Sequence, residues 1–175
     1  YYLNKDPHRF LEGTLVAAKL VEAEKCYIYI RDEYYGLIKL IEKQINILEN
    51  QKIIPKDYLL IRRGAGAYIC GEESALIESI EGKRGLPRNR PPYVAEVGLF
   101  GRPTLVHNVE TVYWIREIYE KGGEWFSSHG RNGRKGLRTF SVSGFVKKPG
   151  IKLTDAGITI NELIEEHCGG MLDGH

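Results

Sequence analysis

Three glycines, a tyrosine and two adjacent carboxylates lie together in the segment Gly64-Ala-Gly-Ala-Tyr-Ile-Cys-Gly-Glu-Glu-Ser-Ala-Leu76. Glycines between a strand and a helix let backbone N–H groups approach an anionic ligand at the helix N-terminus. The spacing matches neither the G-x-G-x-x-G fingerprint of dinucleotide-binding folds nor the G-K-[ST] end of a P-loop. Glu72 and Glu73 can also be ordinary first-turn acids that complement the helix dipole, and the pattern alone favours that interpretation.

A basic, proline-rich segment, Glu81–Tyr93, is the second candidate for chemistry. It contains Lys83, Arg84, Arg88 and Arg90, and it ends at Tyr93. Guanidinium groups bind phosphates through two parallel hydrogen bonds, and a tyrosine ring can stack on a planar ligand. A solvated basic loop stiffened by prolines explains the composition equally well.

A third candidate, His107-Asn108-Val-Glu-Thr111, stands at the start of a predicted helix. Asn108 as an ordinary N-cap is the simpler interpretation, and a polar cluster facing a cofactor is the alternative. The other histidines lack the spacing of metal ligands, and the sequence shows no pattern typical of a Ser–His–Asp catalytic triad.

Predicted helices and strands alternate along the chain and flank these three candidate segments. Apolar residues recur at helical spacing over residues 6–24, 37–48 and 108–119 and, after the glycine segment, through Leu76, Ile77 and Ile80. Short β-branched and aromatic runs cover 26–30 and 58–62. This alternation predicts an α/β layered domain with a mainly parallel sheet. Residues 82–103, rich in proline and arginine, are expected to form an irregular loop.

The C-terminal third has a different pattern. Residues 123–136 are rich in Gly, Ser, Asn and Arg and predict a linker between a first domain, 1–122, and a second, 137–175. In the second domain, Pro149-Gly150 predicts a hairpin turn, and Thr159 with Glu162 forms a capping box for a helix. A hairpin followed by a capped helix predicts the start of a small α+β domain.

Composition excludes several classes of protein. The 175 residues are 42% hydrophobic and 27% charged, which excludes disordered and fibrous chains. The net charge of +2 argues against nucleic acid as a partner. No run approaches the roughly 18 apolar residues of a membrane-spanning helix, so we expect a soluble protein that does not insert directly into a membrane.

Cysteine usage and the chain ends suggest a cytoplasmic fragment. The three cysteines form no C-x-x-C pair, which predicts free thiols in a reducing compartment and provides no set of ligands for a [4Fe–4S] cluster. The chain has no signal-peptide pattern and begins with Tyr1 instead of methionine. We therefore expect a cytoplasmic protein of which this chain is one part.

Taken in order, the candidate segments resemble one family. Gly64–Ser79, Glu81–Arg88, Gly101–Thr104 and Asn108–Thr111 are similar to the signature of the NADH-oxidising FMN flavoprotein subunit of respiratory complex I. The same family includes the diaphorase subunits of NAD-reducing hydrogenases and of NAD-dependent formate dehydrogenases. Arg90–Gly98 together with Gly169–His175 looks most like the beta subunit of a soluble formate dehydrogenase.

The resemblance implies a flavin-binding layered domain followed by the start of a β-grasp-like, soluble-ligand-binding domain. It implies FMN and NAD as cofactors, with a [4Fe–4S] cluster in the full-length protein whose ligands lie outside this chain. The residues that it implies for cofactor binding are Tyr68, Gly71, Glu72, Glu73, Arg90, Tyr93, His107, Asn108 and Thr111. Many relatives have lysine and phenylalanine at the positions of Arg90 and Tyr93, and commonly asparagine at that of His107. The charge and the ring needed for NAD are nevertheless kept.

The implied function is electron transfer between NAD(H) and iron–sulfur clusters through FMN, within a formate dehydrogenase or, alternatively, complex I or a hydrogenase. The implied partners are a thioredoxin-like [2Fe–2S] subunit and a catalytic subunit. The chain would be part of an NADH dehydrogenase (diaphorase) subunit and inactive alone, with no catalytic side chain and no metal ligand of its own. A non-catalytic binding or scaffold module is the alternative of another class.

Overall fold

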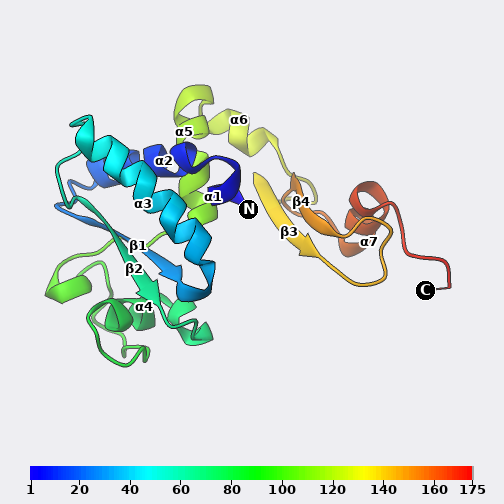
Figure 1. Cartoon of the computed structure of the whole chain (residues 1–175). Helices are drawn as coiled ribbons and strands as arrows, with labels where there is room; N and C mark the ends of the chain where they lie inside the picture. Colours follow the sequence, from blue (N-terminus) through cyan, green and yellow to red (C-terminus); the bar gives the residue numbers. More distant parts are fainter. Residues whose placement is uncertain (175) are drawn as a thin grey trace. The chain divides into compact units, whose positions relative to one another are not determined.

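The computed structural model describes residues 1–174 and divides the chain into two compact units. The first comprises Tyr2–Ile115, and the second comprises Arg116 onward together with Tyr1. Figure 1 shows the first unit as helices around a pair of strands and the second as a hairpin with short helices. Each unit is described by itself.

The first unit is built on two parallel strands, β1 (Cys26–Arg31) and β2 (Leu59–Gly64). They pair in register from Cys26 opposite Leu59 to Arg31 opposite Gly64, so β2 continues two residues beyond the predicted strand. The predicted parallel sheet is confirmed, and both strands end at the same edge.

Helices cover both faces of this sheet (Figure 1). The helices α1 (Tyr2–Lys5), α2 (Pro7–Leu20) and α3 (Tyr35–Asn50) lie on one side, and α4 (Glu73–Ile80) lies on the other. The helix α5 spans Val109–Lys121, and the boundary between the two units falls within it, between Ile115 and Arg116. Short 3₁₀ turns, η1 (Asp32–Tyr34), η2 (Tyr68–Gly71) and η3 (Leu99–Gly101), complete the first unit.

The strand residues alternate between the two helical layers, as the period of two requires. Tyr29 donates or accepts a hydrogen bond with Ser79 of α4 at 3.0 Å, and Tyr27 packs against the cluster of Ile77, Val94 and Leu99. Ile28 and Ile30 point to the opposite face, where α3 buries Ile38, Ile41 and Ile45. The helical spacing of apolar residues therefore predicts the buried face of α3 correctly.

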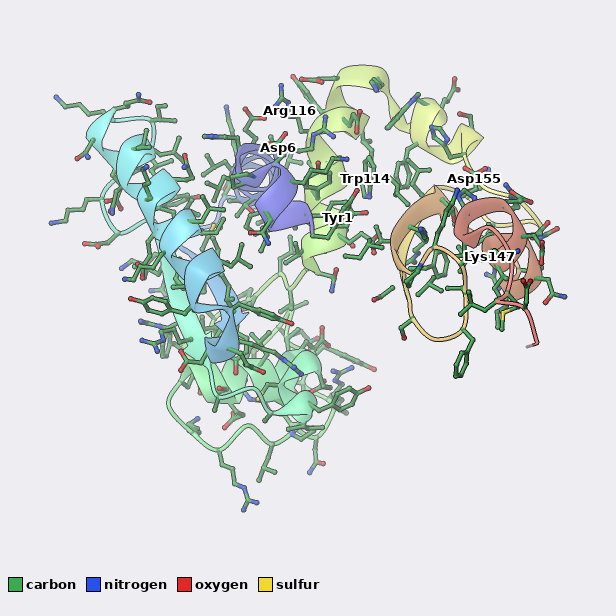
Figure 2. The ribbon with its side chains drawn as sticks, turned by 45° about the vertical axis from the view of Figure 1, so that its right-hand side comes forward. Tyr1, Asp6, Trp114, Arg116, Lys147 and Asp155 are labelled. Carbon is green, nitrogen blue, oxygen red and sulfur yellow. The ribbon has the colours of Figure 1, made fainter. Side chains whose placement is uncertain are left out.

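Helix ends follow the predicted capping residues. Asp6, labelled in Figure 2, accepts a hydrogen bond from the Arg9 N–H at 3.0 Å and caps α2, whose first residue is Pro7. Tyr68–Gly71 form the 3₁₀ turn η2, and α4 begins at Glu73, so Glu73 lies in its first turn as predicted. The side chain of Glu72 caps α4, and this explains why the helix starts at Glu73.

The second unit contains the end of α5, α6 (Gly123–Ser128) and an antiparallel pair, β3 (Leu137–Val142) and β4 (Gly150–Asp155). The pair is followed by α7 (Ile160–Glu162) and the π-helical turn η4 (Leu163–His167). The predicted capping box is present, with the Thr159 hydroxyl accepting from the N–H of Glu162. The segment predicted as a linker contains α6 and a tight loop, and the proposed domain limits stay a prediction.

Candidate functional site

The candidate site lies at the edge of the sheet where the parallel strands end. β1 continues into η1, and β2 continues through Ala65–Ala67 and η2 into the N-terminus of α4. In parallel α/β sheets, ligands bind outside the carboxyl ends of the strands. The glycine-rich segment predicted from the sequence occupies that position.

Two glycines allow the chain to pass through this edge. A Cβ on Gly64 would lie 2.4 Å from the ring and hydroxyl of Tyr29, so a larger residue would displace that ring. Gly66 has a φ of +79°, a backbone conformation that side chains strongly disfavour. The predicted requirement for glycine is therefore explained by close packing and by backbone conformation.

Glu72 has a structural role at the start of α4. One carboxylate oxygen accepts hydrogen bonds from the Ala75 N–H at 2.9 Å and from the Ser74 hydroxyl at 2.6 Å. Burial raises the pKa of this carboxyl, but these hydrogen bonds and the charge of Arg90 outweigh burial and hold the pKa below its ordinary value. Glu72 is thus an ionised helix cap, a role close to the simpler of the two interpretations above.

Arg90 is the residue that joins two of the candidate segments. Its Nη2 lies 2.5 Å from a carboxylate oxygen of Glu72 and 2.7 Å from one of Glu73. All three side chains keep roughly a third of their surface exposed, at 39%, 32% and 35% for Arg90, Glu72 and Glu73. The structure therefore places one cation and two carboxylates together at the surface beside the glycine loop.

Three other predicted site residues are exposed at or near this edge. Tyr68 is 91% exposed and Tyr93 is 56% exposed. An added Cβ on Gly71 would meet nothing within 4 Å. The surface around η2 is consequently open to a ligand, and its aromatic rings are available for stacking.

His107, Asn108 and Thr111 form a separate group at the start of α5, and they are exposed or partly exposed. The Asn108 side chain accepts a hydrogen bond from the Glu110 N–H at 2.9 Å, as expected of a residue that caps the helix start. Among residues 1–174, none of these three forms a hydrogen bond with Tyr68–Glu73 or with Arg90. The structure brings the first two candidate segments into contact, and among the described residues no hydrogen bond joins the third segment to them.

Other polar residues at the edge were not singled out from the sequence. Asp32 pairs with Arg63, and a Cβ on Gly66 would lie 3.1 Å from the carboxylate of Glu33. These acids directly follow β1 and so share the edge with the glycine loop. Their place immediately after a predicted strand was the available signal.

The basic loop contributes fewer free cations than its composition indicates. Arg88 is bound to Glu78 and Glu81, and Lys83 pairs with the same two carboxylates. Arg102 pairs with Glu24. Arg84 is exposed and forms no ion pair in the part of the chain that is described.

The described residues hold no group of three or more His, Cys, Asp or Glu side chains suited to a metal ion. Cys26, Cys70 and Cys168 are free. No helix among residues 1–174 has the length and apolar character needed to cross a membrane.

A glycine-rich loop, a helix N-terminus and an arginine at the carboxyl ends of parallel strands define an α/β domain of the class that binds phosphate-bearing cofactors. Residues 1–117 match the family model described as the Nuo51 FMN-binding domain. The chain belongs to this family and is part of an FMN-binding domain.

Curated relatives agree with this assignment. The chain is 43% identical to the mitochondrial NADH-ubiquinone oxidoreductase 51 kDa subunit of Neurospora crassa, over 98% of this chain and 36% of that protein. It is also 43% identical to the mitochondrial NADH dehydrogenase flavoprotein 1 of Dictyostelium discoideum, over 98% of this chain and 38% of that protein. The chain thus spans less than two-fifths of the length of these two relatives.

A solved structure supports the fold. The crystal structure of an NAD⁺-reducing [NiFe]-hydrogenase in the H₂-reduced state superimposes with a TM-score of 0.87. The match covers 97% of this chain and 29% of that one, at 37% sequence identity. The predicted family and fold class are confirmed.

Proposed function

We propose that the Gly64–Glu73 edge forms one wall of a site for FMN and NAD in an oxidoreductase subunit that exchanges electrons between NAD(H) and iron–sulfur clusters. The observation that carries the proposal is the ion pair of Arg90 with Glu72 and Glu73, directly beside the exposed glycine loop. It supplies a cation, carboxylates and open backbone at one place on the sheet edge.

The residues present fit a planar, anionic cofactor. The open space beside Gly71 admits the close approach of a flat ring, and the exposed ring of Tyr68 can pack against it. Asn108 and Thr111 stand at the start of a helix, where N–H groups and the dipole favour a phosphate. When bound, FMN supplies the conversion between two-electron and one-electron transfer.

Three residues are proposed to bind and select the nicotinamide nucleotide: Arg90, Glu73 and Tyr93. Arg90 keeps the positive charge that binds a diphosphate, and Tyr93 keeps a ring face for stacking. Glu73, which Arg90 holds at 2.7 Å, places a negative charge on this surface. A carboxylate there would repel the additional phosphate of NADP and favour NAD. His107 is proposed to line the flavin side of the site.

The complete protein is proposed to work within a multi-subunit dehydrogenase, because the curated relatives belong to NADH oxidoreductases and the solved neighbour is an NAD⁺-reducing hydrogenase. The resemblance of Arg90–Gly98 and Gly169–His175 favours a formate dehydrogenase. A [4Fe–4S] cluster, a thioredoxin-like [2Fe–2S] subunit, a separate catalytic subunit and a cytoplasmic location belong to the same proposal. The enzyme that copurifies with the complete protein distinguishes formate dehydrogenase from complex I and hydrogenase.

The test uses the complete protein, reconstituted with FMN and kept free of oxygen. NADH and then NADPH are added while the flavin absorbance is followed. We expect bleaching by NADH and little by NADPH. Bound flavin that neither nucleotide bleaches would overturn the nicotinamide assignment, and failure to bind FMN would support a non-catalytic binding module.

A matched pair of variants connects this test to the proposed residues. Glu73→Gln removes the carboxylate beside Arg90, and Glu42→Gln removes an exposed carboxylate of α3 that pairs with Lys39. We expect Glu73→Gln alone to reduce the preference for NADH over NADPH. Equal behaviour of the two variants would remove Glu73 from the nucleotide site.

A further inference from the structure

The second unit contains a groove that the flavin and nicotinamide site does not use. The groove has a volume of about 660 Å³ and is lined by Gly133, Arg134, Lys135, Arg138, Phe140, Ala156, Gly157 and Ile158. Three of these residues are cationic and none is acidic. All of them belong to residues 116–174, in the loop before β3, in β3 itself and in the turn after β4. Asp155, which ends β4 immediately before that turn, is labelled in Figure 2.

A tight turn holds the cationic side of the groove. Asn132 and Gly133 have φ values of +53° and +75°, and the Arg134 N–H donates to the Arg131 carbonyl at 3.0 Å. Positive φ at both central residues is the conformation of a type I′ turn, for which Asn-Gly is a preferred pair. The turn therefore sets the direction in which Arg134 leaves the loop.

Further hydrogen bonds fasten this turn to the end of the hairpin. The Arg131 N–H donates to the Ala156 carbonyl at 2.9 Å, and the Asn132 side chain donates to the Gly157 carbonyl at 3.0 Å. A Cβ on Gly157 would lie 2.1 Å from the Arg131 carbonyl oxygen and 2.8 Å from the Arg134 Cβ. The two sides of the groove are thus in close contact, and its shape exists before any ligand binds.

Among residues 1–174, no carboxylate pairs with the cations that line the groove. Arg131, on the other side of the turn, pairs with Glu166 at 2.9 Å and lies 3.6 Å from Glu162. In contrast, Arg134, Lys135 and Arg138 form no ion pair or side-chain hydrogen bond anywhere in the described chain. Lys152 is the cross-strand partner of Phe140 and so adds a fourth positive charge on the face of the hairpin that carries the Phe140 ring.

We propose that this groove binds a ligand with two or more phosphate groups joined to a flat ring, the chemistry of a nucleoside diphosphate. Arginine guanidinium groups bind phosphate oxygens through paired hydrogen bonds, and three cations that line one groove suit a multiply charged anion. Phe140 and Ile158 offer an apolar surface for a ring at the side of this open groove. The groove belongs to a different unit from the proposed flavin site, and this proposal does not depend on that site.

The test is a calorimetric titration of the complete, FMN-loaded protein with inorganic diphosphate and with ADP. The groove variant is Arg134→Gln/Arg138→Gln, and the control Lys147→Gln removes one exposed charge from the loop between β3 and β4. Arg90→Gln reports binding at the other site, and Phe140→Leu removes the ring and keeps an apolar side chain. Circular dichroism and the FMN content verify that each variant is folded.

We expect the groove variant to lose at least about tenfold in affinity for both probes at this groove, while Lys147→Gln retains wild-type binding. Arg90→Gln should remove only the binding that belongs to the nicotinamide site and leave the groove's contribution in place. We also expect ADP to bind more tightly than diphosphate, and this advantage to disappear in Phe140→Leu. Equal affinity for the two probes would reduce the proposal to a phosphate site without ring recognition and contradict it in that form. Binding lost in Arg90→Gln and retained in the groove variant would overturn the proposal, as would binding of neither probe to the wild-type protein.

Discussion

The Nε of Arg88 donates a hydrogen bond to Oε1 of Glu78 at 2.5 Å. The same guanidinium lies 3.1 Å from Glu81 and donates to the Gly98 carbonyl at 3.1 Å. The Arg88 backbone N–H donates to the buried hydroxyl of Ser74 at 2.8 Å. Arg88 thereby fastens the irregular loop to α4, and Arg90 follows two residues later, within reach of Glu72 and Glu73.

Replacing Arg88 is expected to destabilise the fold. Its side chain is only 25% exposed, and Arg88→Gln would remove its hydrogen bonds to Glu78, Glu81 and the Gly98 carbonyl, leaving the exposed Lys83 as the cation shared by the two carboxylates. Hydrogen bonds to charged groups contribute about 1.5–3 kcal/mol, so we expect a loss of that size in the free energy of unfolding, measured in urea. Arg84→Gln is the control, expected to change stability by less than about 0.5 kcal/mol. Equal effects of the two substitutions would contradict the role given to Arg88.

The Glu72 cap predicts a specific dependence of stability on pH. Its pKa lies below the ordinary value of 4.5 in the folded protein, so ionised Glu72 stabilises the fold above that pH. This contribution is lost as the pH falls below 4.5 through the folded-state pKa. Glu72→Gln should cost about 1 kcal/mol at neutral pH and less in acid, measured by urea unfolding from pH 7 to pH 3. A cost that does not change with pH would show that the charge of Glu72 is unimportant.

Two glycines of the same loop should respond differently to alanine. A methyl group on Gly64 would lie 2.4 Å from the Tyr29 ring, so Gly64→Ala should destabilise the protein by about 1–3 kcal/mol. Gly71 has open space around it, so Gly71→Ala should leave the unfolding free energy nearly unchanged. If Gly71 faces the flavin, that substitution should weaken FMN binding, measured by fluorescence titration of the complete protein. Gly71→Ala with unaltered FMN affinity would remove Gly71 from the site.

Local sequence signals predicted much of the first unit because each has a local physical cause. The spacing of apolar residues predicted α3 and its buried face, and Asp6-Pro7 predicted the start of α2. In the second unit, the capping box of Thr159 and Glu162 was predicted for the same reason. In each case the residues that determine the structure are adjacent in the chain.

Contacts between distant residues were not predictable in this way. The start of α4 at Glu73 depends on Glu72 as cap, and Glu72 is held in turn by Arg90, 18 residues later. Whether an arginine of the basic loop is free or paired depends on which carboxylates the fold brings to it. Composition could therefore identify the loop as cationic, but it could not separate Arg88, which is bound to α4, from the exposed Arg84.

Substitution of Tyr68 can distinguish a role in FMN binding from a role in stability, because its side chain is 91% exposed. Tyr68→Ala should change the free energy of unfolding by less than about 0.5 kcal/mol, since few contacts are lost. If the ring packs against the flavin, the same substitution should raise the dissociation constant of FMN by about fivefold to tenfold, the effect of losing one aromatic contact of about 1 kcal/mol. Tyr119→Ala is the matched control, because Tyr119 is 82% exposed on α5 and has no proposed contact with a cofactor. A fall in stability for Tyr68→Ala, or equal FMN affinity in the two variants, would contradict the placement of Tyr68 at the flavin.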